Sequence, residues 1–167
     1  MKVLIQGLGE IPITAELALE KEKPDVAYVM CSDYQLMYVH PDYQKSNKDV
    51  ITETARKTKS KVVFKRCNVF DPKAVRDCLA DILHRVDPAK DEVVVNYTGG
   101  SAPVRLFLGV FGVQLAKFSP KTKILYAISY KKEGVEFSDN HTEMLKELLP
   151  TDIDLLLEIF KSKPVQR

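Results

Sequence analysis

Two glycine turns carry the residues of this sequence that could bind a ligand through the backbone. Gly7-Leu8-Gly9-Glu10 and Thr98-Gly99-Gly100-Ser101 each follow a short apolar run. Closely spaced glycines let the chain approach a ligand and turn several N–H groups toward one point. A predicted helix start lies behind each turn and adds the positive end of its dipole. The combination predicts a site for an anion such as phosphate.

A site of this kind needs a strand before each turn and a helix after it. The pattern of apolar residues predicts both elements at both turns. Helical three–four spacing of apolar residues is typical of buried helix faces, while short continuous apolar runs are typical of buried strands. The predicted strands are 2–6, 25–31, 61–65, 93–97 and 123–129, and the predicted helices are 11–23, 48–58, 71–86 and 104–115. Residues 32–48 are predicted to form a loop with a short helical piece, whose tyrosines either stack on a base or pin the loop to the domain.

The alternation of strands and helices predicts one α/β domain over residues 1–167. Its fold class is a Rossmann-like, mostly parallel sheet of about six strands flanked by helices. Both turns would then lie at the carboxyl ends of their strands, where ligands bind. Residues 134–137 predict a weaker sixth strand, antiparallel because no helix-length connection precedes it. Two C-terminal helices over 141–162, divided at Pro150, are expected to pack on the domain.

Composition excludes several classes of function. The 25 basic and 23 acidic residues give a net charge of only +2, which argues against a continuous basic face for long nucleic acid. No apolar run approaches the roughly 20 residues that span a bilayer. Met1 leads directly into a strand and a glycine turn rather than into a secretory signal, so the expected location is cytoplasmic.

The cysteines and histidines form no chemical motif. Cys31, Cys67 and Cys78 are widely spaced, and Cys31 and Cys78 fall on apolar stretches where small buried side chains are expected. The three histidines are scattered along the chain and do not pair with a cysteine. The sequence therefore predicts no thiol catalysis, no metal site and no cofactor.

A dinucleotide site is the first alternative to consider. Gly7-Leu8-Gly9 follows the first strand, and Asp33 follows the second strand as a ribose-binding acid would. The third glycine of that fingerprint is missing, because Pro12 occupies its place. A P-loop is excluded, since neither turn continues into Gly-Lys-Ser/Thr.

Taken together, the two turns resemble the CRISPR-associated Rossmann-fold (CARF) domain. The features that carry the resemblance are Leu8-Gly9, Pro12, Thr14 and Glu16 at the first turn, and Asn96, Thr98-Gly99-Gly100-Ser101 and the apolar helix behind them at the second. The resemblance covers essentially the whole chain, as a stand-alone CARF protein without an effector domain. The Thr-Gly-Gly turn is its more specific half.

This resemblance implies a homodimer that binds a cyclic oligoadenylate, with cyclic tetra-adenylate as the expected ring, in type III CRISPR antiviral signalling. The ring would cross the two-fold axis, with its phosphates on the turns and its adenines in flanking pockets bordered by Ser32 and Asp33. The apolar helix behind Gly100 would form part of the dimer interface. The implied ligand-binding residues are Gly7, Gly9, Glu10, Ile11, Ser32, Asp33, Thr98, Gly99, Gly100, Ser101, Ala102 and Arg105.

Stand-alone CARF proteins are often ring nucleases, in which the ribose 2′-hydroxyl attacks the adjacent phosphorus without metal and leaves a 2′,3′-cyclic phosphate. In their pattern a serine precedes the proline of the first turn and a lysine follows the second. Ile11 and Ala102 occupy these positions here. Ser101, Arg105 or Lys65 could substitute for them, which makes Ser101 and Arg105 the candidate catalytic residues.

Three functional hypotheses follow from the sequence. The first is a sensor or sponge for the messenger, the second a slow metal-independent ring nuclease, and the third a nucleotide-cofactor enzyme of the Rossmann type. The same residues could also have purely structural roles instead of binding a ligand. The glycines could serve only to make turns, and Arg105 could belong to a surface ion pair.

Overall fold

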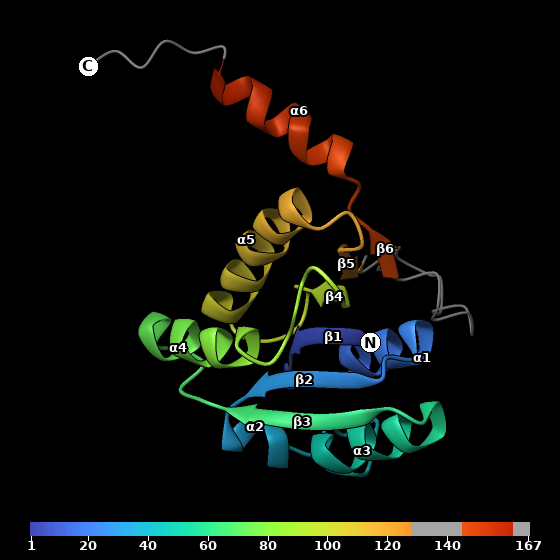
Figure 1. The fold of residues 1–167 in the computed structure, drawn as a ribbon. Helices are drawn as coiled ribbons and strands as arrows, with labels where there is room; N and C mark the ends of the chain where they lie inside the picture. Colours follow the sequence, from blue (N-terminus) through green and yellow to red (C-terminus); the bar gives the residue numbers. More distant parts are fainter. Residues whose placement is uncertain (128–144, 162–167) are drawn as a thin grey trace, which may run out of the picture.

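The computed structural model describes residues 1–127 and 145–161 (Figure 1). The strands are β1 (Lys2–Gly7), β2 (Val26–Cys31), β3 (Lys61–Arg66), β4 (Glu92–Asn96), β5 (Lys123–Ala127) and β6 (Leu145–Glu147). The helices are α1 (Ile13–Glu22), α2 (Asp33–Met37), α3 (Asn47–Thr58), α4 (Pro72–Leu83), α5 (Ala102–Phe118) and α6 (Pro150–Lys161).

The six strands form one sheet in the order β3-β2-β1-β4-β5-β6. The pairs among β1 to β5 are parallel, and β6 is antiparallel to β5. The chain moves outward from β1 to β3 and then returns to the other side of β1 to form β4. Strand order therefore reverses between β1 and β4, and in such sheets the crevice at that reversal is where ligands bind. The predicted fold class is confirmed.

Alternate residues of the central strands divide the core between the two faces of the sheet. Val3 and Val93 face α4 and α5, whereas Leu4 and Val94 face α1 and α3, and all four side chains are fully buried. Helices cover both faces (Figure 1). Strands buried on both faces read as continuous apolar runs, which is why the sequence identified them so clearly.

The predicted helix over 141–149 is wrong where the structure describes it, because Leu145–Glu147 forms β6. The leucine spacing of this segment is helical, but Leu149 precedes Pro150, and the residue before a proline disfavours helical backbone. The outer edge of β5 also offers unpaired backbone groups, which β6 satisfies. Leu145 is buried against the core and Lys146 is exposed, as in a half-buried strand. The second C-terminal helix is confirmed as α6.

The strand predicted at 134–137 lies outside the described residues. Of the helices in the part of the chain that is described, none has both the length and the apolar character needed to cross a membrane. In the predicted loop over 32–48, the short helical piece is α2, and Ser32 caps it by accepting from the backbone N–H of Gln35 at 3.1 Å.

Candidate functional site

The two glycine turns lie side by side at the carboxyl ends of β1 and β4. A Cβ atom on Gly7 would overlap the carbonyl oxygen of Gly99, and one on Gly99 would overlap the carbonyl oxygen of Gly7. Gly100 adopts a φ of 98°, which side-chain-bearing residues rarely adopt. The glycines therefore do more than reverse the chain. They let two backbone turns from distant parts of the sequence touch.

Both turns hold backbone N–H groups that have no partner in the described part of the chain. None of its hydrogen bonds uses the N–H of Gly9, Glu10 or Ile11 in the first turn. The same is true of Gly99, Gly100 and Ser101 in the second. A Cβ atom on Gly9 would lie only 3.7 Å from the nitrogen of Gly100, so the two sets of donors are close to each other. Clustered N–H donors of this kind suit an anion.

A buried amide pair holds the second turn in place. Asn96 and Gln6 are both fully buried at the ends of β4 and β1, and the Asn96 Nδ2 donates to Gln6 Oε1 at 3.2 Å. The same Nδ2 donates to the carbonyl of Thr14 at 3.1 Å, while Asn96 Oδ1 accepts from the N–H of Thr98 at 3.2 Å. Buried polar groups of this kind require partners, and satisfied networks rigidify the backbone around them.

A second buried amide holds the first turn. The two N–H bonds of the Asn47 Nδ2 are shared among the carbonyls of Gly9 at 3.2 Å, Glu10 at 3.0 Å and Gln35 at 2.8 Å. Asn47 follows the Ser46 N-cap of α3, where an asparagine is an ordinary helix-start residue. No local pattern marks a contact that spans nearly forty residues of chain, so sequence reasoning missed it.

The Ser101 hydroxyl is already engaged. It donates to the carbonyl of Val69 in the β3–α4 loop and accepts from the N–H of Val104 at 3.4 Å, as the N-cap of α5. Ser101 thus lies at the second turn. Its backbone N–H has no hydrogen-bond partner in the described chain, and its side chain is used in hydrogen bonds within the fold. Thr98 has a similar structural contact, because its Oγ1 accepts from the N–H of Ala127 at 2.7 Å.

Arg105 stands at the end of the first turn of α5 and is exposed. Within the described residues no carboxylate forms an ion pair with it, and the first turn of α5 carries no acidic residue. A cation near a helix N-terminus opposes the dipole, so its position does not stabilise the fold. Arg105 lines the same groove as Thr98 and Ala102 at the second turn, and a phosphate bound there would accept from a guanidinium.

The other predicted residues fall into two groups. Glu10, Ile11 and Ala102 are exposed at the turns themselves, and the side chain of Ile11 is half exposed. Ser32 and Asp33 lie one strand away, after β2. The Asp33 carboxylate lies 3.3 Å from the Arg66 guanidinium, so it is already paired.

Lys65 is not at the turns. It lies on β3, two strands from β1, and forms an ion pair with Asp81 of α4. Its amine is therefore engaged away from the place where a phosphate would bind, although the sequence alone allowed it to substitute for the missing lysine.

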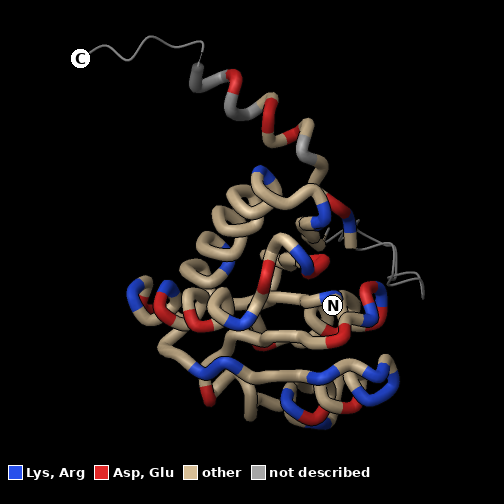
Figure 2. Tube along the Cα trace, viewed as in Figure 1, with Lys and Arg blue, Asp and Glu red and all other residues tan. Residues whose placement is uncertain are grey.

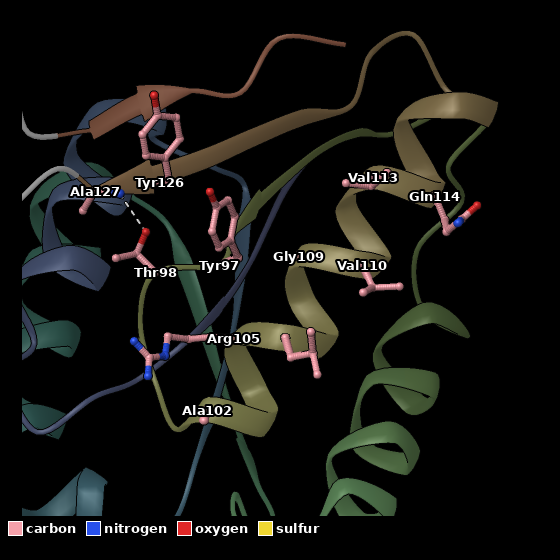
Figure 3. A pocket seen from close by; sticks show the side chains of 11 residues that line it. Tyr97, Thr98, Ala102, Arg105, Gly109, Val110, Val113, Gln114, Tyr126 and Ala127 are labelled. Atoms are coloured by element: carbon pink, nitrogen blue, oxygen red, sulfur yellow. Dashed lines mark hydrogen bonds between the residues drawn. The ribbon is translucent and has the colours of Figure 1, made fainter. Parts of the chain in front are cut away.

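An apolar groove of about 720 Å³ runs along α5 from the second turn (Figure 3). Tyr97, which follows β4, and Tyr126 of β5 lie at one side with ring centroids 6.3 Å apart, and α5 forms the other side. Leu106 and Val110 of α5 are 65% and 55% exposed. Charged residues are sparse along α5 and denser on α3 and α4 (Figure 2). An apolar helix face this exposed is typical of an interface.

The cysteines give no sign of a nucleophile. Burial raises the pKa of the Cys31 and Cys78 thiols to about 12, so both are protonated at neutral pH. Burial also raises the pKa of Cys67. Among the described residues, His, Cys, Asp and Glu form no group that could hold a metal ion.

Comparison with known proteins bears on the fold. No family model matches the sequence, and no curated protein matches it. The solved structures of similar fold include Csm6 from Enterococcus italicus bound to cyclic hexa-2′-fluoro-hexa-dAMP (TM-score 0.65, 12% identity), Can2 from Sulfobacillus thermosulfidooxidans in complex with cyclic tetra-adenylate (0.55, 12%), and protein VC1899 from Vibrio cholerae (0.55, 8%).

These similarities cover 96%, 77% and 76% of this chain and 45%, 32% and 30% of the three others. The chain thus spans less than half the length of the proteins it resembles. At 8–12% identity the similarity shows the fold alone, which is the Rossmann-like α/β fold that the sequence predicts.

Proposed function

We propose that the protein binds a cyclic oligoadenylate, with cyclic tetra-adenylate as the first ring to test, in type III CRISPR antiviral signalling in the cytoplasm. The observation that carries this proposal is the pair of touching turns with unpaired N–H groups at the point where strand order reverses. The fold supports it, because two proteins of similar fold are bound to a cyclic hexa-dAMP analogue and to cyclic tetra-adenylate.

In this proposal the phosphates of the ring lie on the two turns. The N–H groups of Gly9, Glu10, Gly99 and Gly100 donate to phosphate oxygens, and the N-terminal end of α5 adds its dipole. Arg105 supplies the positive charge, since its guanidinium has no acidic partner in the described chain. Ser101 contributes its backbone N–H, because its hydroxyl is engaged with Val69 and Val104.

The proposed assembly is a homodimer. The exposed apolar face of α5 begins at the second turn, so a partner seated on Leu106 and Val110 would bring the two pairs of turns together. A two-fold axis beside the turns would let one ring contact both subunits. A ring with repeated phosphates suits such a symmetric site, because each subunit presents the same donors.

The structure favours binding over cleavage. The side chain of Ile11 is apolar and Ala102 has no functional group, the Ser101 hydroxyl is engaged, and Lys65 is paired with Asp81. Arg105 remains as the positively charged candidate, and a positive charge can stabilise a transition state only when the 2′-hydroxyl is also aligned for attack. We therefore expect a sensor or sponge that leaves the ring intact, with ring cleavage as the alternative outcome of the test.

Incubation with radiolabelled cyclic tetra-adenylate in EDTA tests the proposal, with each sample run on a native and on a denaturing gel. We expect a shifted band containing intact ligand. Linear products that end in a 2′,3′-cyclic phosphate would instead make the protein a ring nuclease. Absence of a shift with both cyclic tetra- and cyclic hexa-adenylate would overturn the proposal. Competition by a dinucleotide cofactor would favour the third hypothesis.

A matched pair of variants locates the binding. Arg105→Ala removes the charge beside the turns, and Arg76→Ala removes an exposed arginine of α4 that pairs with its neighbour Asp77. Both variants lower the net charge by one, so a general electrostatic effect would weaken both equally. We expect only Arg105→Ala to reduce the shifted band. Equal reduction in both would place the ligand elsewhere.

A further inference from the structure

Asn47 contacts the first turn from the side opposite the second turn. Its side chain is fully buried and also donates to Gln35 of α2, the helix that follows β2. In the sheet, β2 and β4 lie on opposite sides of β1. The first turn is therefore held between the Asn47 amide on the β2 side and the second turn on the β4 side.

This placement fixes the direction of two N–H donors. In a trans peptide the carbonyl and the N–H point in opposite directions. Asn47 holds the carbonyl of Gly9, which shares a peptide with the N–H of Glu10, and the carbonyl of Glu10, which shares a peptide with the N–H of Ile11. Both N–H groups are therefore turned away from Asn47, toward the crevice between β1 and β4.

We propose that Asn47 is the positioning residue of the anion site, which orients the Glu10 and Ile11 N–H groups toward a phosphate; this inference rests on the proposed function. Asn47 does not touch the ligand. It acts through the backbone of the first turn, and its loss lets the two peptides rotate, so that the donors no longer converge with those of Gly99 and Gly100.

The hydrogen-bonding state of Asn47 supports this role. Its Nδ2 serves three carbonyls, whereas its Oδ1 is buried without a partner in the described chain. A buried acceptor without a partner is unfavourable. The amide is therefore held at this place by its donors, because an apolar side chain of similar size would leave the carbonyls of Gly9, Glu10 and Gln35 without them.

Asn47 also closes the loop that leads to α3. Its backbone N–H donates to the carbonyl of Tyr38 at 2.9 Å, and Val39 and Ser46 form an antiparallel bridge beside it. The loop of residues 38–47 is thus closed at its base by the same residue that holds the first turn. Because one side chain joins the loop, α2 and the turn, its position is fixed from three directions.

Two variants and one control test the proposal. Asn47→Leu keeps a similar volume without donors. Asn47→Asp keeps the shape and can donate only when its carboxyl is protonated, which burial favours as the pH falls. Ile51→Val, at a fully buried position one turn further along α3, removes a methyl group and no hydrogen bond to the first turn. Binding of cyclic tetra-adenylate is measured by titration, and backbone amides are followed by NMR with and without ligand.

We expect Asn47→Leu to weaken binding by at least about tenfold, since charge-assisted donors are lost, while Ile51→Val binds as the wild type does. In Asn47→Leu the ligand still shifts the amides of Gly99 and Gly100 but no longer those of Glu10 and Ile11. Asn47→Asp recovers affinity relative to the wild type as the pH is lowered. If Asn47→Leu does not fold, Asn47→Asp at two pH values provides the test alone.

The outcomes separate this inference from the proposed function. If the wild-type protein binds no cyclic oligoadenylate, the proposed function is overturned. The amide chemical shifts of Glu10 and Ile11, compared between wild type and variants without ligand, then still test whether Asn47 orients these two N–H groups. Variants that lose stability yet bind with wild-type affinity overturn the positioning role. The positioning role is also overturned if the ligand-induced changes in amide chemical shift disappear equally in both turns, because a residue that only stabilises the fold would affect the whole site.

Discussion

Gly99→Ala should destabilise the protein because it separates the two turns. The new Cβ atom would overlap the carbonyl oxygen of Gly7 and lie 3.2 Å from both the carbonyl carbon of Gly7 and the Oγ1 of Thr14. Gly7 is the last residue of β1 and pairs with Met30 of β2, so it has little freedom to move. Relief therefore requires the β4–α5 turn to shift, and with it the start of α5.

The size of the effect follows from the rigidity of the obstacle. Inserting one methyl group into a well-packed core costs typically about 1–3 kcal/mol. Here the obstacle is paired backbone rather than the end of a flexible side chain, so we expect the upper end, about 3 kcal/mol. With a urea m-value of about 2 kcal/mol per molar, the unfolding midpoint falls by about 1.5 M.

Urea unfolding at a fixed protein concentration measures the change, with Gly109→Ala as the control. Gly109 lies in the interior of α5, and a Cβ atom there would be 3.9 Å from the nearest atom, in the ring of Tyr97. Alanine in a helix interior is more stable than glycine by about 0.5–1 kcal/mol, so the control should be stabilised. A free energy of unfolding for Gly99→Ala that lies within about 0.5 kcal/mol of the wild-type value would refute the close approach of the turns.

Three further predictions follow from single residues. Arg105→Ala should weaken cyclic tetra-adenylate binding about tenfold or more without lowering the melting temperature, because a cation at the start of α5 opposes the dipole; a lowered melting temperature would instead indicate a structural ion pair. Val110→Asp should convert the proposed dimer to a monomer in light scattering, because it places a charge on the exposed apolar face of α5; an unchanged mass would remove α5 from the interface. Burial raises the pKa of Glu16 in the folded protein. The protonated carboxyl therefore contributes stability at pH values below the ordinary glutamate pKa. This stability is lost as the pH rises through the raised pKa. Glu16→Gln removes this loss and still accepts from the Thr54 hydroxyl, so its stability relative to wild type should increase as the pH rises above the ordinary glutamate pKa of about 4; a difference that stays constant would contradict the effect of burial.

Local patterns predicted the parts of the fold that depend on local chemistry. The buried strands read as apolar runs, and both glycine turns stood between a strand and a helix, so their meeting at one edge of the sheet followed from parallel topology. The prediction failed at 145–147, where apolar spacing favoured a helix. The edge of β5 decided that segment, and an edge is a property of the assembled sheet.

The candidate site divides in the same way. Backbone donors in glycine turns were predictable because the residue type sets the backbone freedom. The partners of polar side chains were not, since these depend on distant contacts. Ser101 is engaged by Val69, Lys65 by Asp81, and Asp33 by Arg66. Asn47 reaches the first turn from a helix nearly forty residues away. For these residues the type indicates what a side chain can do, and the fold decides whether it is available.

Pro12 at the start of α1 weighs against a dinucleotide cofactor in the crevice between β1 and β4. Such a cofactor needs a carboxylate that accepts from the ribose hydroxyls, and Asp33, which is exposed beside the Arg66 guanidinium, retains lone pairs for this. It also needs a glycine where the first helix meets the sheet, and Pro12 is buried at that position as the N-cap of α1. The unpaired N–H groups of the crevice remain as the proposed phosphate site, with donors from both turns rather than from one. Two sets of donors that meet at β1 and β4 suit a ligand whose phosphates repeat around a ring better than a ligand with a single pyrophosphate. The second turn therefore decides between a cyclic oligoadenylate and a dinucleotide cofactor, because the first turn alone would suit either.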